Sequence, residues 1–466
     1  MHARRASTPR WTARASPTRR PRHRFGCDSS APSLAAPAAR DTWSPLVNPA
    51  SPPRQERVLT LLLAGVQFSH LLDFMIIMPL GPEFIRRFGI TTAQFGAMVS
   101  SYTLASAAMG VLGLFWLDRF DRKRTLLAIF AGFILSTMAC GAATGYVSML
   151  VARSLAGACA GLMGAVIMAI IADVVPPERR GRAIGTVMST IGLSAVAGVP
   201  LGLALANLLG WRAPFWAICG LAGVLWLGLL KALPRLDQHL SRSDEETRRN
   251  PLSTLAAPGL ALGWLLTFSV AFASFLLIPY LGTYMVGNLG LSQTDLPWVY
   301  LGGGAGTLVA AKLVGRFTDR LGAGRMLALL LVGTVGPHLL FTHLSPSPLP
   351  VVMGAFVLFM ALTSTRAIPT IALVTARVPP SLRGRFLAVN MAASDGASGL
   401  SAWVSGMLIA TSPEGALIGF GQVGWMAVAV TALSLCLLWT LLESSQRKPH
   451  GHARQEAPFP PPSHPG

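Results

Sequence analysis

Four charged residues stand out inside long apolar stretches of this 466-residue chain, where a charge is costly and usually functional. They are Asp73, Arg153, Arg366 and Asp395. A buried carboxylate favours its neutral form, whereas a nearby arginine favours the charged form. Separating such a pair therefore changes the affinity of the carboxylate for a proton. The chemistry that these residues offer is reversible proton binding.

Helical spacing predicts how these charges pair. Asp73 and Arg153 each lie roughly 8 to 12 Å from the same end of their apolar stretches, at about 1.5 Å per residue. Arg366 and Asp395 lie roughly 14 to 15 Å from the other end by the same measure. We interpret Asp73 as the proton-binding group and Arg153 as the residue that tunes it, with a static helix-joining pair as the alternative. Static pairing and substrate contact are equally open for the second pair.

Polar residues near these charges predict the lining of a substrate cavity. Gln67 and His70 share one face of a helical wheel with Asp73. His70 is either a second titrating group or a hydrogen-bonded packing residue. A second arc, on the stretch that holds Asp395, contains Asn390, Ser394, Ser398, Ser401 and Ser405. Pro369, one turn after Arg366, predicts a helix kink that makes room for a ligand.

The elements that must position these residues are membrane-spanning helices. Hydrophobic residues make up 52% of the chain and charged residues 12%, and the mean hydropathy is +0.53. Apolar runs near twenty residues long can cross about 30 Å of hydrocarbon as helices, and they lack the alternation of a membrane β-barrel. Twelve such spans are predicted, at residues 58–81, 94–117, 125–143, 148–172, 183–207, 214–233, 258–285, 297–317, 326–343, 351–376, 386–410 and 421–442.

The spans predict an all-α polytopic membrane protein with two six-helix bundles, 58–233 and 258–442, related by a pseudo-two-fold axis. Residues 234–257 form a charged cytoplasmic connector, and residues 443–466 a disordered tail. Residues 1–57 are basic, rich in Arg, Ser and Pro, and predicted to be disordered. This extension resembles a transit peptide, or else it reflects an over-extended start with the true beginning near Val47 or Val58.

Lysine and arginine concentrate in the loops that follow every second span. Because basic loops remain on the cytoplasmic side, both termini and the connector are predicted to be cytoplasmic. The net charge of +19 then reflects topology and the basic extension, so nucleic-acid binding is not expected.

Two loop signatures recur about two hundred residues apart, which indicates that the chain is a duplication. Asp118-Arg119, followed by Arg122, is matched by Asp319-Arg320 with Gly315 and Gly322 around it. The second signature, Val-Pro-Pro followed by Arg-Gly-Arg, begins at Val175 and again at Val378. Such an aspartate beside arginines can form a latch that breaks when the halves rock apart, or the charges only fix topology.

These motifs resemble the major facilitator superfamily, and within it the drug:proton antiporter and sugar-efflux branch, over residues 57–443. The resemblance implies that Asp118 works with Arg122 and with the acidic residues Asp173 and Glu178. In the first copy, Leu114 and Asp121 replace the glycines of the motif. Arg153 belongs to a segment that resembles the arginine motif of the family. The segment containing Gly198, Pro200 and Gly202 resembles one associated with exporters, where glycines allow close helix approach and proline bends the helix.

We therefore expect a monomeric transporter in the plasma membrane, most simply a bacterial inner membrane. It would export a small organic molecule in exchange for protons by alternating access. The alternatives are a proton-coupled importer and a transport-dead sensor on the same scaffold. The sequence has no phosphate-cradling GxxxxGK loop and no metal-ligand cluster, so we expect neither an enzyme nor a cofactor, and ATP is not the expected energy source.

Overall fold

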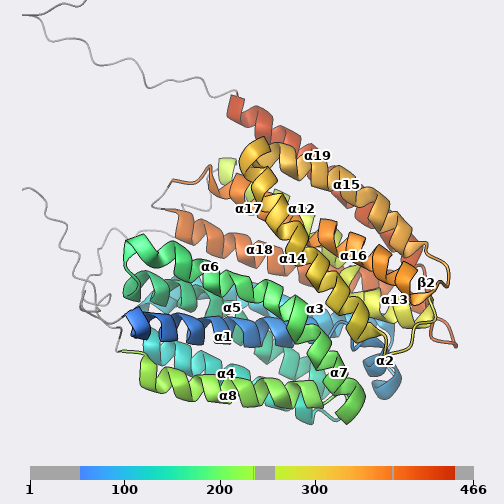
Figure 1. Ribbon diagram of the computed structural model, residues 1–466, viewed down its shortest axis with the longest axis horizontal. Coiled ribbons are helices and arrows are strands. Elements are labelled where there is room, and N and C mark those ends of the chain that lie inside the picture. Colours follow the sequence, from blue (N-terminus) through green and yellow to red (C-terminus); the bar gives the residue numbers. More distant parts are fainter. Residues whose placement is uncertain (1–52, 235, 237–257, 380–381, 447–466) are drawn as a thin grey trace, which may run out of the picture. The chain divides into compact units, whose positions relative to one another are not determined.

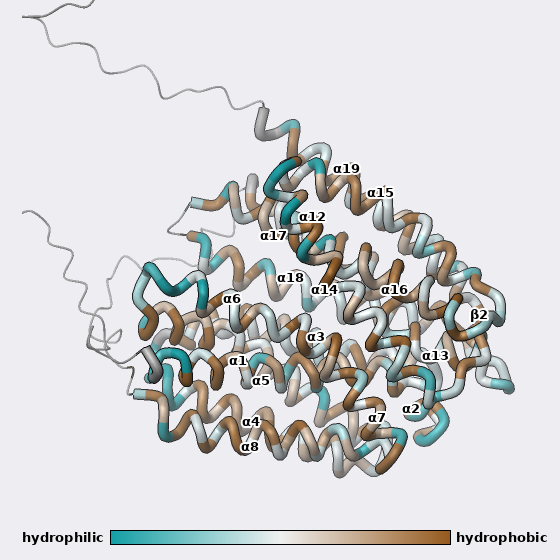
Figure 2. Tube along the Cα trace, viewed as in Figure 1, coloured by the Kyte–Doolittle hydropathy of each residue, from teal (hydrophilic) through white to brown (hydrophobic). Residues whose placement is uncertain are grey.

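The apolar spans fold as helices in the computed structural model, which describes residues 53–234, 236, 258–379 and 382–446. Most of the predicted segments 1–57, 234–257 and 443–466 lie outside these residues. Figure 1 shows the described helices, which all belong to one compact unit. Figure 2 shows apolar residues along the helices and hydrophilic ones gathered at helix ends.

The first half of the chain contains the helices that carry Asp73 and Arg153. Its elements are α1 (Pro53–Ile76), α2 (Gly81–Phe88), α3 (Thr92–Trp116), the 3-10 turn η1 (Leu117–Arg119), α4 (Arg122–Ala142), α5 (Tyr146–Val174), α6 (Pro177–Leu193), the π-helical turn η2 (Ser194–Gly198), α7 (Val199–Leu209) and α8 (Ala213–Ala232).

The second half repeats this plan and adds a short hairpin. Its elements are α12 (Pro258–Phe275), η3 (Ile278–Tyr280), α13 (Leu281–Gly287), α14 (Leu296–Leu321), α15 (Ala323–Thr342), α16 (Leu349–Thr365), α17 (Ala367–Thr375), α18 (Arg383–Leu408), β1 (Ala410–Thr411), β2 (Leu417–Ile418) and α19 (Phe420–Gln446).

The twelve predicted spans all correspond to helices. Among the described residues, ten helices or helix series are long and apolar enough to cross a membrane. The other two spans are α14 and α18, each 26 residues long and rich in polar or glycine residues. The short helix α2 and the β1–β2 hairpin were not predicted, because each is too short for a periodic pattern to reveal.

Two predicted helix distortions are confirmed. The tenth span breaks at Arg366, between α16 and α17, because Pro369 has no N–H to bond the carbonyl one turn earlier. The fifth span contains η2 directly before Pro200, so the helix changes its winding there.

The two ends of the bundle differ. We call the end that holds η1 and the Val175–Pro177 loop the arginine-rich end. Arg122 pairs there with Asp173, and Lys123 donates to the carbonyl oxygen of Leu230. We call the other end of the bundle, which holds α2 and the β1–β2 hairpin, the opposite end.

At the opposite end the two halves are joined. Thr92 donates its hydroxyl proton to the carbonyl oxygen of Ile409, and Asn207 donates to that of Gln293 at 3.0 Å. A Cβ placed on Gly282 would lie 2.9 Å from Cα of Pro79, so the chain segments of the two halves meet without room for a side chain.

Two seams connect the halves along the helices. In the first, α3 packs along α18, and the Ser100 hydroxyl donates to the carbonyl oxygen of Gly399 at 2.6 Å (Figure 1). In the second, α14 contacts the first half mainly through η2 and α7 and much less through α6. A Cβ on Gly304 of α14 would lie 2.6 Å from the carbonyl oxygen of Ala195.

Two glycines bring α5 into backbone contact with α3. A Cβ on Gly157 would lie 2.0 Å from the carbonyl oxygen of Tyr102, and one on Gly161 would lie 2.1 Å from that of Ser106. Glycines four residues apart lie on one helix face and let a second membrane helix approach closely. Arg153, one turn before Gly157, extends the same face.

This contact predicts that Gly157→Ala destabilises the protein. The added methyl group meets a backbone carbonyl that cannot rotate away, and such overpacking costs about 1 to 3 kcal/mol of unfolding free energy. The matched control is Gly220→Ala on α8, where the new Cβ has no neighbour within 4 Å. Thermal unfolding of the purified variants in detergent measures the effect, and equal melting temperatures for the two would contradict the prediction.

Candidate functional site

Asp73 of α1 and Arg153 of α5 form an ion pair in the interior of the first half. Arg153 Nη1 lies 2.7 Å from Asp73 Oδ2 and also donates to the Asp73 carbonyl oxygen at 3.1 Å. Both side chains are 0% exposed. The guanidinium carbon of Arg153 lies 4.2 Å from the ring centre of Tyr102 on α3, a cation–π contact. The predicted pairing of Asp73 with Arg153 is confirmed.

The pair leaves hydrogen-bonding capacity unused. Among the described residues, Asp73 Oδ1 has no hydrogen-bond partner, and neither do Arg153 Nε and Nη2. The buried hydroxyl of Thr137, on α4, also has no hydrogen-bond partner among the described residues. A carboxylate with one oxygen paired and one unpaired can accept a proton without first losing every partner.

Gln67 and His70 stand on the same helix as Asp73. Gln67 is buried and His70 is partly exposed. Gln67 Oε1 and His70 Nε2 both lack a hydrogen-bond partner among the described residues. A buried polar atom without a partner is costly, so both atoms need a partner that the described residues do not supply.

Arg366 does not pair with Asp395, so that part of the sequence prediction is wrong. Arg366 is wholly buried and donates to four oxygens within the second half. These are the hydroxyls of Ser274 at 2.6 Å, Thr431 at 3.4 Å and Thr334 at 3.5 Å, and the carbonyl oxygen of Thr363 at 3.3 Å. The prediction rested on position along each helix, which does not determine the direction in which a side chain points.

Asp395 instead contacts the first half. Its Oδ2 accepts the hydroxyl proton of Ser106, on α3, at 2.6 Å. Asp395 is partly exposed and Ser106 is buried. This hydrogen bond crosses the seam between the halves. Sequence reasoning missed Ser106, because nothing in the pattern distinguishes it from the other serines of that span.

Most polar side chains of the arc predicted on α18 form hydrogen bonds within the second half. Asn390 is buried and accepts the Thr267 hydroxyl proton at 2.7 Å, and Ser398 donates to the carbonyl oxygen of Ser394 at 2.8 Å. Serines in helices often bond the carbonyl four residues earlier, so a polar arc does not require a wet surface. Ser394 and Asp395 are the partly exposed members of the predicted set.

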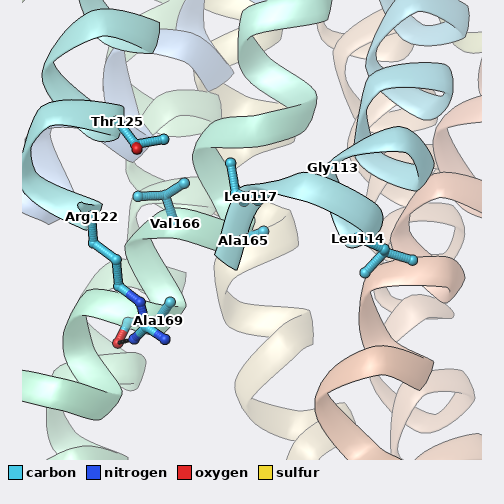
Figure 3. Close-up of a pocket in the computed structure, with 8 residues that line it drawn as sticks. All are labelled: Gly113, Leu114, Leu117, Arg122, Thr125, Ala165, Val166 and Ala169. Atoms are coloured by element: carbon cyan, nitrogen blue, oxygen red, sulfur yellow. Dashed lines mark hydrogen bonds between the residues drawn. The ribbon is translucent and has the colours of Figure 1, made fainter. Parts of the chain in front are cut away.

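The first loop motif brings Arg122 and Asp173 together. Arg122 Nη1 lies 2.5 Å from Asp173 Oδ2 and donates to the Ala169 carbonyl oxygen at 2.9 Å. Arg119 and Glu178 are exposed, and the side chain of Asp118 lies outside the described residues. Figure 3 shows Arg122 with Leu114 and Leu117 around a small pocket between α3, α4 and α5.

Asp121, which replaces a motif glycine, has a structural task that the sequence analysis missed. Its Oδ1 accepts from the Arg124 backbone N–H at 2.7 Å and so caps α4. Its Oδ2 accepts from the backbone N–H of Leu236 at 3.2 Å. An aspartate directly before a helix is a standard capping signal, which could have identified this role.

The second loop motif is more open. Asp319 and Arg320 are exposed in the last turn of α14, and a Cβ on Gly315 would have no neighbour within 4 Å. Gly322 ends the helix with a φ of 84°, which favours glycine. Within the described residues, the second motif has no ion pair that corresponds to the Arg122–Asp173 pair of the first motif.

The exporter-like segment packs closely on α1. A Cβ on Gly198 would lie 2.9 Å from Leu72, and one on Gly202 would lie 2.7 Å from Ile76. Pro200 is buried between them at the start of α7. These contacts show why small residues stand here, as the motif predicted.

Comparison with known proteins identifies the scaffold. The family model described as Major Facilitator Superfamily matches residues 63–262 and again residues 263–464. A chloramphenicol resistance protein of Streptomyces lividans is 30% identical over 76% of this chain and 94% of its own length. A chloramphenicol efflux pump of Mycobacterium tuberculosis is 27% identical over 70% of this chain and 77% of its own length.

Solved structures share the fold at low sequence identity. A bacterial homologue of the human lysosomal transporter Spinster, in an inward-facing and occupied conformation, has a TM-score of 0.68 and 19% identity. It aligns with 84% of this chain and 98% of its own. A D-xylose-proton symporter has a TM-score of 0.68 and 18% identity, over 83% of this chain and 98% of its own.

The burial of the Asp73–Arg153 pair predicts strong non-additivity. Asp73→Asn or Arg153→Gln alone leaves one buried charge unpaired and costs roughly 3 to 5 kcal/mol of unfolding free energy. The double variant removes both charges, so it is more stable than the two single losses together imply. Thermal unfolding in detergent measures all four proteins. Additive losses would show that the two side chains do not interact.

Proposed function

The chain belongs to the Major Facilitator Superfamily, and on that premise we propose that it exports a small organic molecule in exchange for protons. The observation that carries the proposal is the wholly buried Asp73–Arg153 pair with its unpaired Asp73 oxygen. The pair joins α1 to α5 within the first half, so the proposal requires these two helices to shift relative to each other during the transport cycle. Lengthening the Arg153 contact removes the charge that favours ionised Asp73, and the carboxylate then takes up a proton.

The direction of transport rests on the relatives and on the exporter-like segment. Two relatives carry names that state chloramphenicol resistance or efflux. Chloramphenicol is therefore the first substrate to test. Gln67 and His70 supply the unpaired acceptor and ring nitrogen that would hold hydroxyl or amide groups of a neutral molecule.

Orientation in the membrane follows from the basic loops. We place the arginine-rich end in the cytoplasm. Because the halves are joined at the opposite end, and because α14 packs on η2 and α7 more than on α6, this arrangement corresponds to an inward-facing state. The contact between Arg122 and Asp173 lies within one half and would stiffen the α3–α4 loop during rocking.

Proton-driven uptake into inverted membrane vesicles tests the exchange. Acidifying the vesicle interior should drive chloramphenicol inward in wild type, because each proton that leaves powers entry of substrate. Asp73→Asn should reduce this uptake at least tenfold, since an amide cannot carry a proton. The control Glu414→Gln changes an exposed loop carboxylate and should transport normally. Uptake by Asp73→Asn equal to wild type would remove Asp73 from the mechanism, and uptake only without a gradient would favour import.

Accessibility of single cysteines tests the orientation. In a variant without the native cysteines, a cysteine replacing exposed Thr411 at the opposite end should react with a membrane-impermeant maleimide in intact cells. A cysteine replacing exposed Arg320 at the arginine-rich end should react only after the cells are opened. The reverse labelling pattern would invert the proposed topology.

A further inference from the structure

Asp395 is a membrane-embedded carboxylate that forms no ion pair with any arginine of the described residues. Arg366, the partner that helical spacing predicts for it, donates instead to hydroxyl and carbonyl oxygens of its own half. Within the described part of the chain, the hydrogen bond to the Asp395 carboxyl group comes from Ser106. Ionisable groups inside a membrane span are costly and are retained for function, so the residue needs an explanation beyond packing.

Its position is central. Asp395 lies about 18 Å along α18 from Arg383 and about 20 Å from Leu408, at 1.5 Å per residue, so it is at the middle of the helix. The exposed Met391 stands one turn away, and a Cβ on Gly164 of α5 would lie 3.7 Å from its terminal carbon. This side of α18 therefore faces the first half, and the partly exposed carboxyl group can be reached from between the halves.

The charged and titratable neighbours of Asp395 can be named for the four helices that contact α18 most, which are α3, α12, α17 and α19. On α3 the group is Tyr102, one turn before Ser106, and its ring contacts Arg153. The described parts of α12 and α17 contain no ionisable side chain, and Arg366, between α16 and α17, points to Ser274. On α19, Cys436 and Glu443 stand toward the arginine-rich end.

Ser106 suits both forms of a carboxyl group. A serine hydroxyl has one donor and two acceptor lone pairs. It donates to the ionised carboxylate, as in the structure, and it accepts from the protonated acid after rotating about its C–O bond. Gly161 fixes the Ser106 backbone against α5, so the hydroxyl stays in place through the change.

We propose that Asp395 is a second proton-binding carboxyl group of the transport cycle, and that Ser106 is the positioning residue that serves both of its protonation states. The proton comes from water on one side of the membrane and returns to water on the other, and no covalent bond besides O–H is made or broken. This inference rests on the proposed proton exchange, but it assigns a different residue from Asp73 and a different location, the seam between α3 and α18.

Infrared difference spectroscopy tests the assignment without any substrate. The spectrum in alkaline buffer is subtracted from the spectrum of the same purified protein in acidic buffer. The difference contains the C=O stretch of each carboxylic acid that loses its proton between the two buffers. Asp395→Asn should remove one band that Asp73→Asn leaves intact, and Asp395→Glu should restore a carboxylic acid band. Ser106→Ala should shift the frequency of the Asp395 band, because the hydrogen bond to that carboxyl group is gone.

The control is Ser101→Ala on the same helix as Ser106. The Ser101 hydroxyl donates to the Met98 carbonyl oxygen, so the spectrum of this variant should match that of wild type. An Asp395→Asn spectrum identical to wild type would overturn the inference, and an unshifted band in Ser106→Ala would overturn the role of Ser106. A third outcome is that Asp395→Asn loses its band while Asp73→Asn has the spectrum of wild type. That outcome would refute the proposed role of Asp73 and would support this inference. Melting curves of Asp395→Asn and Asp395→Glu show whether each variant is folded, so that loss of the band can be distinguished from unfolding.

Discussion

The ion pair of Asp73 and Arg153 is the interaction on which the first half depends. In hydrocarbon neither charge is tolerable alone, so the pair fixes α1 against α5, and Arg153 also covers the ring of Tyr102 on α3. Gly157 and Gly161 then press α5 onto the α3 backbone. The ion pair and the close glycine contacts thus hold α1, α3 and α5 together. Of these three helices, α3 also packs along α18 of the second half.

The duplicated halves are alike in scaffold and unlike in charge. By the offset between the loop signatures, Asp395 of the α3–α18 seam corresponds to Gly192 in the other seam, which packs against Leu308. One seam is therefore joined by hydroxyl and carboxyl groups, and the other by glycine against backbone and leucine. Duplication supplies a symmetric pair of bundles, while the polar groups that could bind protons stand on one side.

Sequence patterns predicted the spans, the Asp73–Arg153 pair and both helix distortions, because each depends on position along a helix. Pairing of Arg366 with Asp395 failed because depth does not determine the direction of a side chain around the helix axis. Arg366 turns toward Ser274 and Asp395 toward Ser106. The four-residue spacing of Gly157 and Gly161 was visible and could have predicted the α3–α5 contact, whereas Ser106 required the three-dimensional neighbours of Asp395.

The sign of proton movement tests the central claim most directly. Proteoliposomes containing the purified protein, a trapped pH indicator and chloramphenicol are diluted into substrate-free buffer. Exchange of substrate for protons predicts that the interior acidifies as chloramphenicol leaves, and that Asp73→Asn abolishes the change. An interior that becomes alkaline would show that proton and substrate move together, and would contradict the account.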